Sequence, residues 1–323
     1  MVNTQKKCAA HGMVTGVKQF AEIVKGMMES RYGNNCRITV QEVTKNNGIR
    51  LTGISIQEEG CNIAPNIYLD GFFGEYREGR ELEDICREVE QIYRKCRVRR
   101  NFDTGSFMDF GIVREKICFR LVNAERNREL LAKIPHRRYL DLAVVYYVLF
   151  SDEGENLVTT LITDRVMQMW GINEATLHEY AERNTSRLLK GYVCSMEDIL
   201  FGHKWEMPGI REEADRAEAC RMDFTGSAMM YVASNAAKVN GAAVVLYDGV
   251  LKKFARKVGG DFYVLPSSTH EVLFLPVSEV DMDGAELARM VREVNQNEVA
   301  EDEVLSEHAY RYFAEADRME IVG

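Results

Sequence analysis

The stretch from Tyr139 to Phe150, YLDLAVVYYVLF, constrains the fold more than any other part of this chain. It is almost continuously apolar and rich in β-branched and aromatic residues, a pattern typical of a strand buried on both faces. Its uninterrupted apolar part, Leu142–Phe150, is far shorter than the roughly 20 residues that cross a bilayer. The chain therefore has to fold around this strand, with other elements covering each side of it.

The N-terminal part of the chain predicts a helix, a hairpin and a second helix. Apolar residues recur at helical spacing over Val17–Tyr32 and again over Glu81–Arg97. Between them, Arg37–Thr44 and Ile49–Gln57 alternate apolar and polar residues, as strands do. The Asn-Gly pair before the second strand is typical of a tight hairpin turn, which requires a positive φ at Gly48.

The rest of the chain predicts further strands and helices. A second Asn-Gly pair, Asn240-Gly241, predicts another hairpin turn with positive φ at Gly241. A helix is predicted from Glu174, with Asn173 as its N-cap and His178 exposed. Strands are also predicted at Ala228–Ser234, Ala242–Tyr247, Asp261–Leu265, Glu271–Leu275 and near His308–Phe313, and helices at Val250–Val258 and Ala285–Asn295.

Together these elements predict an α+β protein with two lobes of antiparallel hairpins or mixed sheet, with helices packed on one face. At 323 residues the chain is longer than one compact core usually spans. We expect an N-terminal α+β lobe over 1–102, a middle segment with the central strand over 103–205, a polar linker at 206–222 and a C-terminal α+β lobe over 223–323.

The charge and the cysteines limit the classes of function. A formal net charge of -9 opposes the neutralisation of phosphates, so nucleic acid is an unfavourable partner. The eight cysteines form no C-x-x-C pair, which favours reduced thiols over disulfides or zinc ligands. The N-terminus lacks the apolar core of a signal peptide. We therefore expect a cytoplasmic protein without metal, cofactor or membrane association.

The segment Glu279–Gly284 resembles the start of a calcium loop but lacks an essential ligand. In such loops a bidentate Glu stands at the twelfth position, which here is Met290. Asp283 is explained more simply as the N-cap of the helix that follows it. No metal site is therefore predicted.

Two groups of cations are candidates for binding. The first ends the second predicted helix and consists of Arg94, Lys95, Arg97, Arg99 and Arg100. These residues could bind a phosphate or an acidic partner. The alternative is that they only stabilise the helix, because the dipole of a helix favours cations at its C-terminus. The second group, His136-Arg137-Arg138, precedes the central strand and could present cations at a sheet edge.

The densest set of potentially reactive side chains lies in one loop near the C-terminus. Its members are Ser267, Ser268, His270 and Glu271. Nucleophilic catalysis would need a serine bonded to a base and an oxyanion hole, but no G-x-S-x-G elbow is present. A serine and a histidine so close in one turn also rarely face each other as catalytic partners do. We expect a turn between paired strands whose hydroxyls bond the backbone.

Five phrases of the sequence support a resemblance to a known family. They are IAPNIYLDGFF from Ile63, IPHRRYLDLAVVYYVL from Ile134, MQMWGINEATLHEYAERNT from Met167, MMYVASN from Met229 together with NGAAVVLYDGVL from Asn240, and YVLPSSTHEVLFLP from Tyr263. On these phrases the chain resembles a bacterial domain-of-unknown-function family of anaerobic gut bacteria, often found near mobile elements. The resemblance spans Phe20 to Tyr312 and implies no assigned activity.

Two functions remain open at this point. The first is an uncharacterised, non-enzymatic binding or interaction protein, such as an accessory factor of a mobile element, with an unidentified protein or small molecule as partner. The missing catalytic signatures and the resemblance favour it. The alternative is an undescribed hydrolase or transferase that uses the Ser267–Glu271 loop. A concave pocket beside this loop with a third titratable partner would favour the enzyme.

Overall fold

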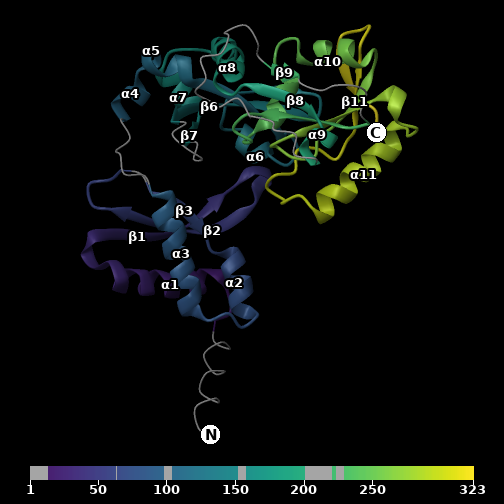
Figure 1. Ribbon diagram of the computed structural model, residues 1–323. Coiled ribbons are helices and arrows are strands. Elements are labelled where there is room, and N and C mark those ends of the chain that lie inside the picture. Colours follow the sequence, from purple (N-terminus) through teal and green to yellow (C-terminus); the bar gives the residue numbers. More distant parts are fainter. Residues whose placement is uncertain (1–13, 63, 98–103, 152–157, 201–219, 223–228) are drawn as a thin grey trace. The chain divides into compact units, whose positions relative to one another are not determined.

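The computed structural model describes residues 14–62, 64–97, 104–151, 158–200, 220–222 and 229–323 (Figure 1). The chain divides into two compact units. The first comprises Met1–Lys45 and Ile49–Thr104, and the second comprises Asn46–Gly48 and Gly105–Gly323. Helices and three sheets, whose strands are almost all antiparallel, confirm the predicted α+β class. Of the linker predicted at 206–222, all but 220–222 lies outside the described residues.

The first unit is a three-stranded antiparallel sheet with helices on one face (Figure 1). Its elements are α1 (Val17–Tyr32), β1 (Cys36–Thr44), β2 (Arg50–Glu58), β3 (Asn66–Tyr68), α2 (Asp70–Arg77) and α3 (Leu82–Cys96). Ile54 and Ile56 of β2 pack against Phe20 of α1 and Val89 of α3 in one apolar core. The two predicted helices and the two long strands of this region are confirmed.

The connection between β1 and β2 is longer than a two-residue turn. The Lys45 N–H donates to the Ile49 carbonyl, and Asn46–Gly48 forms a single 3-10 turn between them. Asn47 and Gly48 have φ values of 60° and 71°. The positive φ predicted for Gly48 is therefore confirmed, and Asn47 shares it.

The second unit is built on the predicted central strand. Its first sheet comprises β4 (Ile117–Asn123), β5 (His136–Tyr139), β6 (Leu142–Ser151) and β7 (Val158–Leu161). Strand β6 pairs with β4 along one side and with β5 and β7 along the other. Tyr146 and Val148 face the main core of the unit, whereas Val145 and Tyr147 pack in smaller apolar clusters on the opposite face. The prediction that this strand is buried on both faces is confirmed. Its predicted start at Tyr139 is wrong, because Tyr139 ends β5 and a turn with Leu140 at a φ of 54° leads into β6.

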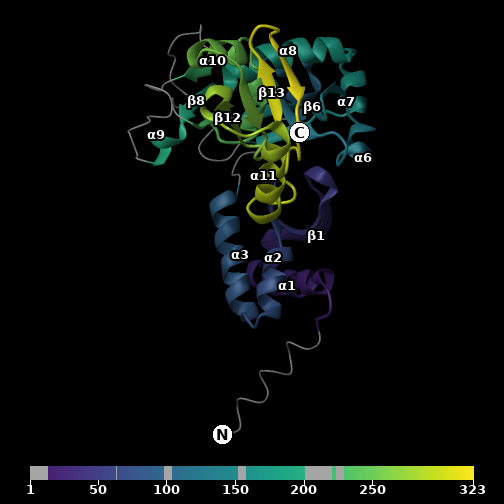
Figure 2. The ribbon, with the colours of Figure 1, turned by 90° about the vertical axis from the view of Figure 1, so that its right-hand side faces the viewer.

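A seven-stranded sheet completes the second unit. Its strands, in spatial order, are β14 (Arg318–Ile321), β13 (Tyr310–Phe313), β11 (Phe262–Leu265), β12 (Val272–Pro276), β10 (Tyr231–Asn235), β8 (Gly191–Ser195) and β9 (Cys220–Met222). All neighbours are antiparallel except β8 and β9. One face shares the main core with β6, and α11 (Gly284–Asn297) packs on the other face, against β11 and β12 (Figure 2).

The remaining helices of the second unit are short apart from α8. They are α4 (Thr104–Met108), α5 (Phe110–Val113), α6 (Arg128–Leu131), α7 (Asp164–Met169), α8 (Glu174–Leu188), α9 (Met196–Leu200) and α10 (Val250–Val258). Asn173 caps α8, as the sequence predicted, by accepting from the Thr176 N–H. Asp283 and Glu286 form a complete capping box at the start of α11.

The strand predicted at Ala242–Tyr247 is wrong. Gly241–Leu246 forms a 3-10 helix, η4, and the residue with positive φ before it is Asn240, at 54°, and not Gly241. Gly241–Val245 is buried throughout. A fully buried segment has no polar face, so its sequence lacks the periodicity that separates a strand from a helix.

Candidate functional site

The Ser267–Glu271 loop connects β11 and β12, which pair antiparallel as the sequence predicted. Hydrogen bonds hold its backbone at several points, among them the bond from the Ala242 N–H to the Thr269 carbonyl. The Ser267 N–H donates to the Leu265 carbonyl, the Ser268 N–H to the Glu271 carbonyl, and the Thr269 N–H to the Glu303 carbonyl. The loop is thus fixed both by itself and by a segment more than thirty residues further along the chain.

The hydroxyl of Ser268 serves the backbone of this turn. It accepts a hydrogen bond of 3.0 Å from the His270 N–H. No hydrogen bond joins the imidazole ring of His270 to the hydroxyl of Ser267 or Ser268 among the described contacts. The histidine and the serines therefore do not form a nucleophile–base pair in this structure.

Both ring nitrogens of His270 already have neighbours. Nδ1 accepts from the Asn240 N–H at 3.3 Å, which places the proton of the neutral ring on Nε2. Nε2 lies 3.3 Å from Oε1 of Glu303. The His270 carbonyl, in turn, accepts from the Ser234 hydroxyl at 2.6 Å. The arrangement orients the imidazole and leaves the neutral ring no unused lone pair.

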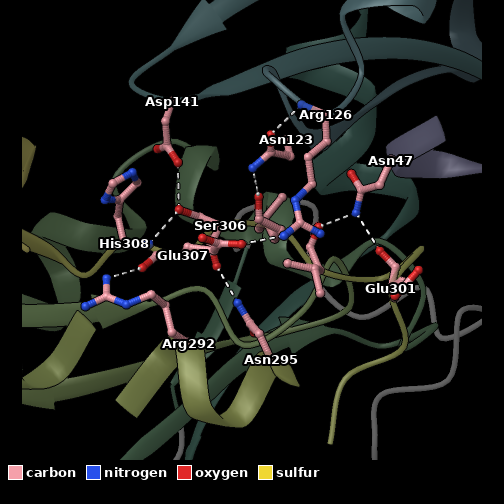
Figure 3. A network of polar contacts seen from close by, with 12 residues as sticks. Asn47, Asn123, Arg126, Asp141, Arg292, Asn295, Glu301, Ser306, Glu307 and His308 are labelled. Atoms are coloured by element: carbon pink, nitrogen blue, oxygen red, sulfur yellow. Dashed lines mark hydrogen bonds and ion pairs between the residues drawn. The ribbon is translucent and has the colours of Figure 1, made fainter. Parts of the chain in front are cut away.

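A network of polar contacts holds the segment that contains Glu303 (Figure 3). Asn47 Nδ2 donates to the Glu301 and Val304 carbonyls, and Asn123 Nδ2 donates to the Leu305 carbonyl. Further contacts in the same segment join Ser306 with Asp141, the Ser306 carbonyl with Asn295, and Glu307 with Arg126. The Glu303 carboxylate thus belongs to a chain segment with many fixed points.

The basic end of α3 is largely neutralised within the first unit. Arg94 pairs with Glu90 at 2.5 Å, and Arg97 pairs with Glu58 at 2.9 Å. Glu58 also accepts from the Tyr93 hydroxyl at 2.9 Å. Lys95 lies in the last turn of α3, where its positive charge interacts favourably with the helix dipole. Arg99 and Arg100 lie outside the described residues.

Each unit has a surface cavity away from the Ser267–Glu271 loop. A cavity of about 750 Å³ in the first unit is lined by the ends of β1 and β2, including Cys36, Glu58 and Cys61. A cavity of about 600 Å³ in the second unit is lined by the end of α10 and the β13–β14 turn, including Arg256 and Asp261. Neither is lined by a residue of the Ser267–Glu271 loop.

A cluster of titratable side chains that no sequence pattern indicated lies where β5 and β6 meet the start of α8. The Tyr146 hydroxyl donates to Glu174 Oε1 at 2.5 Å and lies 3.1 Å from His178 Nδ1. Arg137 donates to Glu174 Oε2 at 3.1 Å. His178, predicted to be exposed, is instead half-buried beside the Tyr146 ring.

The charges of this cluster follow from burial and from its hydrogen bonds. Burial and the Glu174 carboxylate raise the pKa of Tyr146, so its hydroxyl keeps its proton. Burial opposes ionisation of Glu174, but bonds from Tyr146 and Arg137 outweigh it and lower the pKa of that carboxyl. Burial and the nearby Arg137 charge lower the pKa of His178, which keeps the imidazole neutral.

The tautomer of His178 is set by this geometry. Because the Tyr146 hydroxyl gives its proton to Glu174, its oxygen accepts from Nδ1–H of His178. The lone pair of the His178 ring then lies on Nε2, where no described residue donates to it. In His270, by contrast, the lone pair lies on Nδ1 and accepts from Asn240. The clue in the sequence was the i, i+4 spacing of Glu174 and His178, which puts both on one helix face. Their common neighbour on β6 could not be read from that spacing.

The described residues contain no cluster of three or more His, Cys, Asp or Glu side chains that could hold a metal ion. Within the same residues, every helix is too short or too polar to cross a bilayer.

Comparison with known proteins identifies one family. The model of a family of unknown function, DUF5688, matches residues 17–313, which is most of the chain. No curated protein and no solved structure matches it.

Proposed function

This chain belongs to the family of unknown function DUF5688, and we propose that it is a binding or interaction protein rather than an enzyme. The engagement of His270, the histidine of the Ser267–Glu271 loop, supports this proposal most strongly. Its Nδ1 accepts from Asn240 and its Nε2 lies against Glu303, so neither nitrogen is available to a serine. A loop whose polar atoms fix the backbone suits a rigid recognition surface better than a nucleophile.

We further propose a bacterial, cytoplasmic protein that acts as an accessory factor of a mobile element. The resemblance in sequence supports the bacterial and mobile-element part. Free thiols at Cys36, Cys61, Cys86, Cys96, Cys118 and Cys194 support a reducing compartment. Detection of the tagged protein in cell fractions of its host tests the location.

A hydrolase or transferase is the second candidate. The observation in its favour is the Glu303 carboxylate behind His270, since an acidic group orients the imidazole in many nucleophilic enzymes. This function requires the His270 ring to leave Asn240 and turn toward Ser267 or Ser268.

Two measurements on the full chain separate these functions. The protein is treated with a serine-reactive fluorophosphonate and with ester, amide and phosphoester substrates, beside a double variant Ser267→Ala, Ser268→Ala. Protein isolated from its host is then analysed by native mass spectrometry for a bound ligand or partner. We expect equal labelling of both proteins, no turnover, and a bound species of defined mass.

The control is Ser55→Ala, which removes a strand hydroxyl of the first unit. Turnover that survives in Ser55→Ala but is lost in the double variant and in His270→Gln would establish the hydrolase and end the binding proposal.

A further inference from the structure

One face of the sheet around β6 contains an arginine without a counter-charge. On β4, Cys118, Arg120 and Val122 share this face because alternate residues of a strand point to the same side. The strand register places Arg120 opposite Val145 of β6, and Val145 opposite His136 of β5. We call this surface, formed by alternate residues of β4, β5 and β6, the Arg120 face.

Arg120 is half-buried, and no carboxylate of the described residues pairs with its guanidinium. Its Nε is shielded from solvent and has no hydrogen-bond partner in the described part of the chain. Burial lowers the pKa of Arg120, and the only charged or titratable group that offsets this is Tyr147. Arg126 and Arg311 of the same unit, by contrast, each pair with a carboxylate. A shielded donor that lacks a hydrogen-bond partner is costly, so a group that accepts from Arg120 would stabilise the protein.

The hydroxyl of Tyr147 is a second polar group without a partner on the same face. Its oxygen is shielded from solvent, and no partner among the described residues meets hydrogen-bond geometry. The Arg120 charge and the Asn240 side chain partly offset the rise in the pKa of Tyr147. Tyr147 pairs with Cys118, so Tyr147 and Arg120 are diagonal neighbours with Cα atoms about 7 to 8 Å apart. The side chain is only 3% exposed, and burial raises the pKa of Tyr147. The hydroxyl therefore remains a donor.

The surroundings of these two donors favour an anion. Apolar side chains flank them on both sides: Val122, Ala124, Leu131, Ile134, Ala143 and Val145 on one, and Cys118, Leu149 and Leu189 on the other. The other ionisable strand residues of the Arg120 face are Cys118, His136 and Arg138, and no described strand position on it carries a carboxylate. A charge in such an apolar setting attracts its counter-ion more strongly than it would in water.

We propose that Arg120 and Tyr147 bind the carboxylate or phosphate group of a small-molecule ligand. This proposal rests on the binding function proposed above and specifies the chemistry of the ligand. The planar guanidinium can donate two parallel hydrogen bonds to two oxygens of one such group. The Tyr147 hydroxyl donates a further bond to the same group.

The test uses the full chain with inorganic phosphate and, separately, acetate at constant ionic strength. Thermal unfolding is followed as each anion is titrated. We expect saturable stabilisation by at least one anion, and the tighter of the two identifies the ligand group. Arg120→Met should remove this stabilisation, and Tyr147→Phe should raise the half-saturating concentration about tenfold. Arg126→Met, which removes a paired arginine of the same unit, should leave the half-saturating concentration unchanged.

The ligand-free variants give a second, independent readout. Arg120→Met replaces an unpaired charge with an apolar chain and should unfold at a higher temperature than the wild type, whereas Arg126→Met should not. The inference is overturned if neither anion stabilises the wild type in a saturable way, or if Arg120→Met binds as well as the wild type. That failure would leave the proposed binding function intact. The binding function is tested separately, by native mass spectrometry of the protein isolated from its host.

Discussion

At the scale of single residues, Gly241 fulfils a different need from the one that its sequence indicates. An added Cβ would lie 2.1 Å from the Ser234 hydroxyl and 2.3 Å from the His270 carbonyl. Strand β10, the start of η4 and the Ser267–Glu271 loop therefore meet at a point where only a hydrogen atom fits. Close approach of backbones, and not a positive φ, explains this glycine.

Gly241→Ala should destabilise the protein by about 2 to 3 kcal/mol, because the new methyl group has to displace backbone as well as a hydroxyl. The measurement is urea-induced unfolding of the full chain. Gly260→Ala is the matched control, since nothing lies within 4 Å of a Cβ at that position. Equal midpoints for the two variants would contradict the packing described around Gly241.

Glu174 should make the stability depend on pH in the acid range. Its pKa is lowered in the folded protein, so its contribution is complete above its unfolded value of about 4.3 and is lost as the pH falls through the folded value. The free-energy difference between wild type and Glu174→Gln should therefore be largest at neutral pH and shrink from pH 5 towards pH 3. Urea unfolding at several pH values measures it, with Glu179→Gln as a control on the same helix. If the free-energy difference stays constant with pH, Tyr146 and Arg137 do not lower the pKa of Glu174.

At the scale of elements, α8 protects the free edge of β4. Among the described residues no strand pairs with this edge, and an open edge exposes unpaired backbone groups. The Thr185 hydroxyl accepts from the Phe119 N–H at 2.9 Å, and Asn184 Nδ2 donates to the Ile117 carbonyl at 3.2 Å. Two polar side chains of a helix thus replace a neighbouring strand.

Thr185→Val keeps the shape of the side chain but leaves the buried Phe119 N–H without an acceptor. We expect a loss of about 1 to 3 kcal/mol in unfolding free energy and faster exchange of the Phe119 amide hydrogen. Thr176→Val, near the start of the same helix, serves as the control for the change of residue type. Unchanged exchange at Phe119 would show that this edge is protected in another way.

At the scale of the whole molecule, each unit has its own apolar core. The first core is formed by α1, α3 and the β1–β3 sheet. The second is formed by the sheet that contains β6, the seven-stranded sheet, α8 and α10. Buried thiols occur in both: Cys86 in the first, and Cys118 and Cys194 in the second. Burial raises the pKa of Cys86 to about 11 and that of Cys118 and Cys194 to about 12.

These thiols should be inert in the folded protein and reactive after unfolding. At neutral pH a raised pKa keeps them protonated, and the thiolate is the reactive form. A thiol reagent should modify Cys61 and Cys96 well before Cys86, Cys118 and Cys194, as read by mass spectrometry of peptides. Denatured, unreduced protein should yield eight thiols, the full count in the sequence. A clear shortfall would reveal disulfides and argue against a reducing compartment.

The sequence by itself determined the features that depend on neighbouring residues. Helical spacing located α1 and α3, Asn173 and Asp283 marked the starts of α8 and α11, and the apolar run identified β6. Such features follow from backbone hydrogen bonding and from which face of an element is apolar. A few consecutive residues contain this information.

The tertiary structure decided which distant residues meet. His270 faces Glu303, Tyr146 faces Glu174, and Arg120 lies beside Tyr147 with no acidic neighbour on its strands. It also made η4 helical inside a fully buried segment. These outcomes depend on how sheets and helices pack together and exclude water, and the free energy of that packing is shared among segments that no local pattern connects.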